Sequence, residues 1–207
     1  MNRFRHLIAA AATVASLAAC STVMPSAQSG FLSDYTALAG ASDESSARRA
    51  SPVRIDPARV SVDAVGWRVP SSVDISIDER EALLAHLRTE LQRQVRALPA
   101  QPQGRPAVLH AAITRIETVS PALNTPSALL LIAPLDRGGA AVEIEAVDPQ
   151  TGRQLAALTQ GHFAPMPDLK ARFGKLALAE IAVRKAAADF VPLLQPAPDG
   201  AKRIALR

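Results

Sequence analysis

Two carboxylates, Glu143 and Glu145, stand two positions apart in an otherwise apolar stretch. If this stretch forms a β-strand, both side chains point to the same face, about 7 Å apart. Such a pair can hold a divalent cation or divide the roles of acid and base in catalysis. No other Asp, His or Asn obviously completes a site, so we expect both glutamates to face solvent or to pair with Arg153 or Arg115 on neighbouring strands.

Other residue types give little support for catalysis. The four histidines are scattered, and a lone histidine is more often a structural hydrogen-bonder than a ligand. We expect His86 on a helix surface, His110 in a strand and His162 beside a hairpin. The sequence contains no nucleophile-elbow, zinc-protease or phosphate-loop motif, and one cysteine excludes an internal disulfide or a Cys-rich zinc site. The sequence therefore predicts a protein without catalytic residues, metal or cofactor.

The single cysteine, Cys20, has a reactive thiol in a recognisable setting. Leu17, Ala18 and Ala19 precede it, and small side chains let an extended backbone enter a signal peptidase. These four residues resemble the lipobox of bacterial lipoproteins, in which the thiol forms a thioether with a diacylglyceryl group. That resemblance implies that Cys20 becomes the mature N-terminus, with acyl chains that hold it permanently in a membrane.

The residues before Cys20 have the organisation of an export signal. Arg3 and Arg5 are followed by an apolar or small stretch, Leu7 to Ala19, that is too short to span a bilayer. We expect residues 1–19 to be a removed lipoprotein signal peptide; the alternative is an ordinary signal peptide with a fortuitous cysteine. Ser21, in place of an aspartate, favours the outer membrane, with the domain on the periplasmic side. Loss of Arg3 and Arg5 reduces the formal net charge of +4, which leaves no reason to expect nucleic-acid binding.

Residues 20–52 are expected to form the lipidated N-terminus, a tether and a docking segment. Residues 21–30 are small, polar and interrupted by proline, which predicts a flexible tether, and residues 39–52 predict a second linker or a surface loop. Between them, apolar side chains at positions 31, 35 and 38 follow the i, i+4, i+7 spacing that predicts a short helix. This segment either packs on the domain or binds a protein partner through Phe31, Leu32, Tyr35 and Leu38.

Residues 53–191 are predicted to form one α/β domain, followed by a mobile Pro-rich basic tail over residues 192–207. Ser76 and Glu79 form a capping box for a helix, and Asp168 is the expected N-cap of a second helix. The type of the apolar run 127–134 stays open between a buried strand, a short helix and an exposed surface. The other predicted elements are a strand near 60–65, helix 77–98, strand 107–119, a hairpin turning at 148–152 and helix 168–190.

This order, β-α-β-β-β-α, predicts an α+β fold. Two amphipathic helices can bury their apolar stripes against one face of a mainly antiparallel sheet, which gives a two-layer sandwich. The first β-α-β unit predicts one parallel strand pair.

Three stretches resemble a family of bacterial lipoproteins called domain of unknown function 3313. They are Gly30-Phe31-Leu32-Ser33-Asp34-Tyr35, Ile55-Asp56-Pro57, and the strand Ala141 to Glu145 running into Asp148-Pro149-Gln150-Thr151-Gly152-Arg153. The resemblance covers about residues 20–191 and implies an exported lipoprotein with an α/β domain. It implies no catalytic residues.

The sequence thus indicates a lipid-anchored outer-membrane lipoprotein that faces the periplasm. We expect a non-catalytic accessory or assembly factor of an envelope complex, bound to the membrane through Cys20 and to a protein partner. The alternative is a carrier that binds a lipid or another small apolar ligand between the sheet and the helices.

Overall fold

The computed structural model describes residues 24, 28–40, 45–118, 138–163 and 175–196. The signal peptide, the lipobox with Cys20, the apolar run 127–134, Asp168 and residues 197–207 lie outside the described residues. An α+β fold with a mainly antiparallel sheet and two helices is confirmed.

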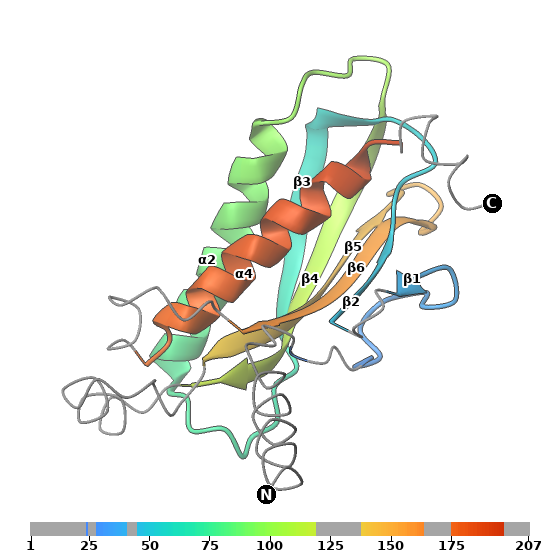
Figure 1. Ribbon diagram of the computed structural model, residues 1–207. Helices are drawn as coiled ribbons and strands as arrows, with labels where there is room; N and C mark the ends of the chain where they lie inside the picture. Colours follow the sequence, from blue (N-terminus) through green and yellow to red (C-terminus); the bar gives the residue numbers. More distant parts are fainter. Residues whose placement is uncertain (1–23, 25–27, 41–44, 119–137, 164–174, 197–207) are drawn as a thin grey trace, which may run out of the picture.

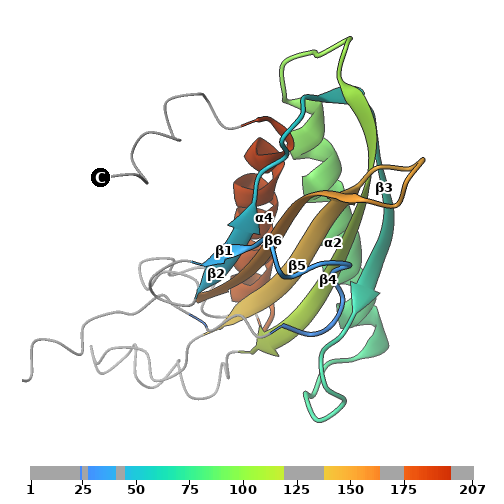
Figure 2. The same ribbon diagram turned by 90° about the vertical axis from the view of Figure 1, so that its right-hand side faces the viewer.

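Six strands form one sheet in the order β1-β2-β6-β5-β4-β3. Strands β3 and β4 pair in parallel, and all other neighbours pair antiparallel. Figures 1 and 2 show both long helices, α2 and α4, on the same face of this sheet. The strands are β1 Ala39–Gly40, β2 Ser46–Arg49, β3 Ile55–Trp67, β4 Arg105–Glu117, β5 Gly139–Val147 and β6 Gln154–Phe163; the helices are α2 Ile77–Arg96, α4 Ala177–Phe190 and the 3-10 helix η3 Val191–Leu194.

Helix α2 begins where the sequence predicts. The Ser76 hydroxyl accepts a hydrogen bond from the Glu79 amide, and the Glu79 carboxylate accepts one from the Ser76 amide. This reciprocal capping satisfies two backbone donors that a helix start leaves unpaired. The bonds from Ser76, and next Lys175, hold the pKa of Glu79 below its ordinary value.

The core lies between the helices and one face of the sheet. Helix α2 buries a leucine stripe (Leu83, Leu87, Leu91) beside β3, and α4 packs on β5 and β6. On β4 the alternation puts Leu109, Ala111 and Ile113 into this core. A bulge between Ile113 and Arg115 then turns Ile116 to the same side.

The β5–β6 hairpin turns as predicted. Gly152 has a φ of 68°, a conformation that glycine adopts without steric cost. The Asp148 carboxylate accepts hydrogen bonds from the amides of Gln150 and Thr151. The hydrogen bond from Gln150 has the largest effect on the carboxyl group. Together with the bond from Thr151 and the charge of Arg105, it holds the pKa of Asp148 below its ordinary value.

Two predictions about the connecting segments are wrong. Residues 46–49, expected in a linker or surface loop, form β2, because they pair with β6 across a large sequence separation. Residues 192–194, expected at the start of a mobile tail, belong to η3, in which Val191 and Leu194 are buried in the core. The second helix, predicted over residues 168–190, is described from Ala177, with Leu176 as its N-cap and a turn at residues 175–176 before it. The predicted cap, Asp168, lies outside the described residues.

Candidate functional site

The face of the sheet opposite the helices is covered by residues 28–38, which we call the strap (Figure 2). The predicted helix in this segment is wrong: its backbone forms bends and turns. Leu32 is buried, and Phe31, Tyr35 and Leu38 are half-buried. The apolar side chains therefore pack against the domain without a helix.

Glu143, on β5, is the first of two glutamates that bind the strap. Its side chain accepts hydrogen bonds from the Ser29 amide (2.7 Å), the Ser29 hydroxyl (2.8 Å) and the Tyr35 hydroxyl (2.7 Å). The residue is only 1% exposed. A carboxylate so deeply buried needs strong donors to offset the loss of water, and the strap supplies three of them.

Glu145 binds the strap two residues further along the strand. It accepts hydrogen bonds from the amide (2.9 Å) and hydroxyl (2.7 Å) of Ser33 and from the side-chain amide of Gln154 (2.8 Å). Gln154 also donates to the backbone carbonyl of Asp34, so β6 helps to hold the strap. His110 Nδ1 lies 3.6 Å from Glu145 Oε1.

Both glutamates were expected to face solvent or to pair with Arg153 or Arg115, and this prediction is wrong. The two side chains do share one face, as alternation requires, but the strap covers that face. Arg115 pairs instead with Glu117, at 2.7 Å. The interpretation assumed that only one face of the sheet is covered.

Small residues on the sheet make room for the strap. Gly66, Ala112 and Glu143 are neighbours across β3, β4 and β5. The Phe31 ring lies over Gly66, where an added Cβ would sit 3.9 Å from it. An alanine at position 66 would fit at this distance, whereas a side chain much larger than alanine would push the Phe31 ring away from the sheet.

The backbone of Met24 lies directly against Gly161 of β6. A Cβ at Gly161 would come within 2.1 Å of the Met24 carbonyl oxygen, closer than any real contact, and Met24 itself is 0% exposed. The prediction of a flexible tether over residues 21–30 is therefore wrong at Met24, which packs against the sheet. Sequence reasoning missed this contact, along with the roles of Ser29, Ser33 and Gln154.

The histidines do not form a metal site in the described part of the chain, where no group of three His, Cys, Asp or Glu is placed to bind an ion. His86, predicted on the surface, is half-buried, and its Nε2 is buried without a hydrogen-bond partner. His110 lies between Glu145 and Asp63. Burial, and next the charge of Lys185, lowers the pKa of His162.

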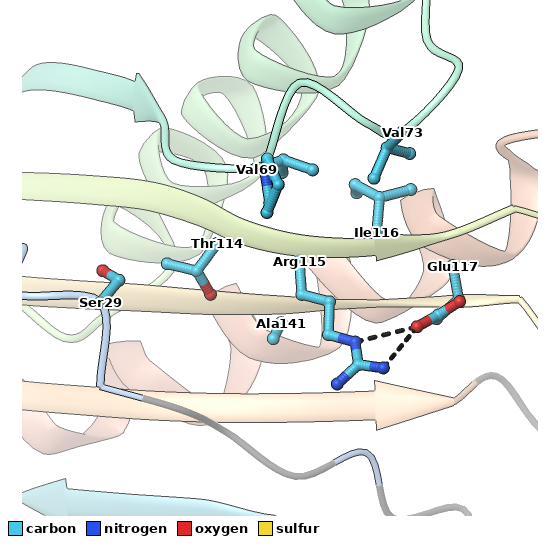
Figure 3. A pocket seen from close by; sticks show the side chains of 9 residues that line it. Ser29, Val69, Val73, Thr114, Arg115, Ile116, Glu117 and Ala141 are labelled. Carbon is cyan, nitrogen blue, oxygen red and sulfur yellow. Dashed lines mark hydrogen bonds and ion pairs between the residues drawn. The ribbon is translucent and has the colours of Figure 1, made fainter.

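An apolar cleft of about 340 Å³ opens where β4 ends and the loop after β3 begins (Figure 3). Val69, Val73 and Ile116 give it an apolar lining, and Arg115 and Glu117 form their ion pair beside it. Ser29 of the strap and Ala141 of β5 also line it. The cleft is therefore partly built by the same segment that the two carboxylates hold.

Residues 27–190 match the family described as protein of unknown function (DUF3313). The chain belongs to this family. The match includes the strap and every element that contacts it, and it confirms the resemblance found in the sequence. No helix in the described part of this DUF3313 protein is long and apolar enough to cross a bilayer.

The DUF3313 chain has distant likenesses among solved structures, and no curated protein matches it. Two are PelC dodecamers from Paraburkholderia phytofirmans, one of them a single-residue variant. The variant aligns with 13% identity and a TM-score of 0.46 over 74% of this chain and 98% of that one. The other aligns with 13% identity and a TM-score of 0.45 over 72% and 98%. A candidate lipoprotein from Caulobacter crescentus aligns with 12% identity and a TM-score of 0.26 over 68% and 92%.

The bond between Tyr35 and Glu143 should stabilise the DUF3313 fold measurably. Hydrogen bonds to charged groups contribute about 1.5–3 kcal/mol. We expect a double-mutant cycle of Tyr35→Phe and Glu143→Gln, measured by urea unfolding, to give a coupling energy of that size. The control cycle pairs Tyr35→Phe with Glu117→Gln and should give less than about 0.5 kcal/mol, since these residues share no contact. Equal coupling in both cycles would contradict the strap's attachment.

The strap should also be visible in a pH titration, because Tyr35 is the single tyrosine of the chain. Burial, and next the hydrogen bond to Glu143, raises the pKa of Tyr35 above 10.0. The unfolded chain therefore loses this proton first, so the stability that the phenol contributes is complete below about pH 10 and is lost as pH rises through the native pKa. Ultraviolet titration of phenolate should give a higher midpoint for the native protein than in urea, and Glu143→Gln should lower it. A native midpoint at or below that in urea would be inconsistent with a bound strap.

Proposed function

We propose that this chain is a lipid-anchored outer-membrane lipoprotein that faces the periplasm and serves as a non-catalytic accessory or assembly factor of an envelope complex. The export signal, the lipobox Leu17 to Cys20 and Ser21 support lipidation and sorting. The observation that carries the proposal is the attachment of the strap. Met24 lies against Gly161, and Ser29 and Ser33 are bound by Glu143 and Glu145, so the chain is attached to the domain within a few positions of the proposed lipid anchor.

The use of the two glutamates supports a non-catalytic role. A general acid or a metal ligand needs oxygen atoms that a substrate or an ion can reach. Glu143 and Glu145 instead accept hydrogen bonds from Ser29, Ser33 and Tyr35 and are almost fully buried. The two neighbouring carboxylates of β5 therefore have a structural role.

A protein partner would meet the strap on its outer side. Phe31, Tyr35 and Leu38 are half-buried and keep part of their apolar surface accessible, whereas Leu32 points into the domain. We propose Phe31, Tyr35 and Leu38 as the residues that contact the partner. Leu32 would act by keeping the strap in place.

A carrier of a small apolar ligand is the second candidate function. What favours it is the apolar cleft lined by Val69, Val73 and Ile116. This cleft lies at the end of β4, whereas the space between the sheet and the helices is filled by core side chains such as Leu87 and Phe190. The ligand would therefore bind at the cleft and not between the two layers.

Lipidation can be tested directly in cells. Cys20→Ser removes the only thiol, so we expect complete loss of fatty-acid labelling and release of the protein from the membrane fraction. Ser21→Ala is the matched control and should keep both properties. Ser21→Asp should keep the label but move the protein to the inner-membrane fraction. Labelling that persists in Cys20→Ser would overturn the proposal.

Native mass spectrometry separates the two candidate functions. For an accessory factor we expect the mature protein, purified in mild detergent, to show its own lipidated mass and no other. A retained extra mass that disappears in Val73→Asp, at a half-buried position in the cleft lining, would favour the carrier. Val183→Ala, altered in the core away from the cleft, is the control and should not change any retained mass.

A further inference from the structure

The chain between the proposed lipid anchor and the first fixed point of the domain is short. Met24 is fully buried against Gly161, and only three residues separate it from Cys20. Fully extended, the four steps of chain from Cys20 to Met24 reach about 14 Å. The Gly161 end of β6 therefore cannot move far from the bilayer that holds the acyl chains.

The opposite end of the sheet is too far away to share this restraint. The hairpin turn at Gly152 lies nine residues along β6 from Gly161, or about 30 Å at the rise of a strand. This distance is about twice the reach of the tether. The two ends of the same strand thus have different access to the membrane.

Several elements meet at the Gly161 end. Strands β3 and β4 both finish there, β5 begins there, and α2 starts after the loop that follows β3 (Figure 1). Trp67 also lies at this end of the sheet. It pairs with Ile113 of β4, and the same row continues through Val142 of β5 to Gln160 of β6, the residue before Gly161.

The side chains at this end suit a membrane surface. In the described part of the chain, Ile77 is the large hydrophobic residue that is exposed to solvent, with 73% of its surface accessible. The Arg80 guanidinium stacks on Trp67 at 5.8 Å from the ring centre. Tryptophan and arginine favour the interface between headgroups and acyl chains, where one part of the side chain is wet and another is apolar.

We propose that the lipid anchor holds this end of the sheet, with Trp67, Ile77 and Arg80, against the bilayer surface, and that the 148–152 turn points away from it. The proposal rests on the lipidation of Cys20 proposed above. The occupant of this surface is the lipid headgroup layer itself, so the orientation needs no protein partner.

The test uses the lipidated mature protein in vesicles of phosphatidylethanolamine and phosphatidylglycerol. Lipidation consumes the only native thiol, so Ser72→Cys near the membrane and Gln150→Cys far from it each provide a unique labelling site, and both positions are exposed. With an energy acceptor on the lipid headgroups, we expect transfer from position 72 to be several-fold more efficient than from position 150. Equal transfer, or more from position 150, would overturn the proposal.

Two matched glycine variants test whether the Met24 contact sets the orientation. Gly161→Ala places a Cβ against the Met24 backbone, so the first fixed point becomes Ser29, nine residues and about 30 Å from Cys20. We expect the difference between positions 72 and 150 to shrink. Gly66→Ala adds a Cβ at an ordinary contact distance from Phe31 and should leave the difference unchanged.

A longer tether gives the same test without altering the domain. A Gly-Ser spacer inserted between residues 20 and 24 should reduce the difference in transfer as its length grows. A difference that is unaffected by spacer length would overturn the proposal. An orientation seen in native envelopes but absent from pure lipid vesicles would also overturn it and assign the surface to a protein partner.

Vesicle flotation separates this inference from the proposed function. Protein that fails to float and lacks the lipid mass contradicts lipidation itself. Protein that floats and carries the lipid, yet transfers energy equally from both positions, contradicts only the orientation.

Discussion

Two buried carboxylates on the central strand β5 attach the strap to the sheet. Glu143 and Glu145 lose their hydration on burial, a cost that is offset only where strong hydrogen-bond donors replace water. Ser29, Ser33 and Tyr35 provide these donors, and all three belong to one short segment. The strap and the two glutamates are therefore stable only in each other's presence.

The two faces of the sheet are covered by different physical means. On one face, α2 and α4 satisfy their own backbone groups and contribute apolar side chains such as Leu87 and Phe190. On the other face, the strap has no regular secondary structure, so its amide groups need acceptors from outside the segment. The carboxylates accept from the amides of Ser29 and Ser33, which explains why charged residues occupy a fully buried strand.

The strap also connects the fold to the proposed membrane anchor. Met24 lies against the end of β6, and the next described residues bind β5 and β6 in turn. A lipid on Cys20 would thus act on a rigid sheet through a few residues of chain, whereas a long flexible tether would leave the domain free to rotate. In our proposal this short connection presents one defined side of the domain to the envelope.

The sequence by itself determined the features that depend on neighbouring residues. The capping box of Ser76 and Glu79, the turn at Gly152 and the inner face of β4 follow from spacing, because their partners lie within a few positions. Only the tertiary structure decided the burial of Glu143, whose partner Ser29 lies 114 positions away, and the same is true of strand β2 and its pairing with β6. Alternation predicts that two glutamates share a face of a strand, but what covers that face depends on the path of the whole chain.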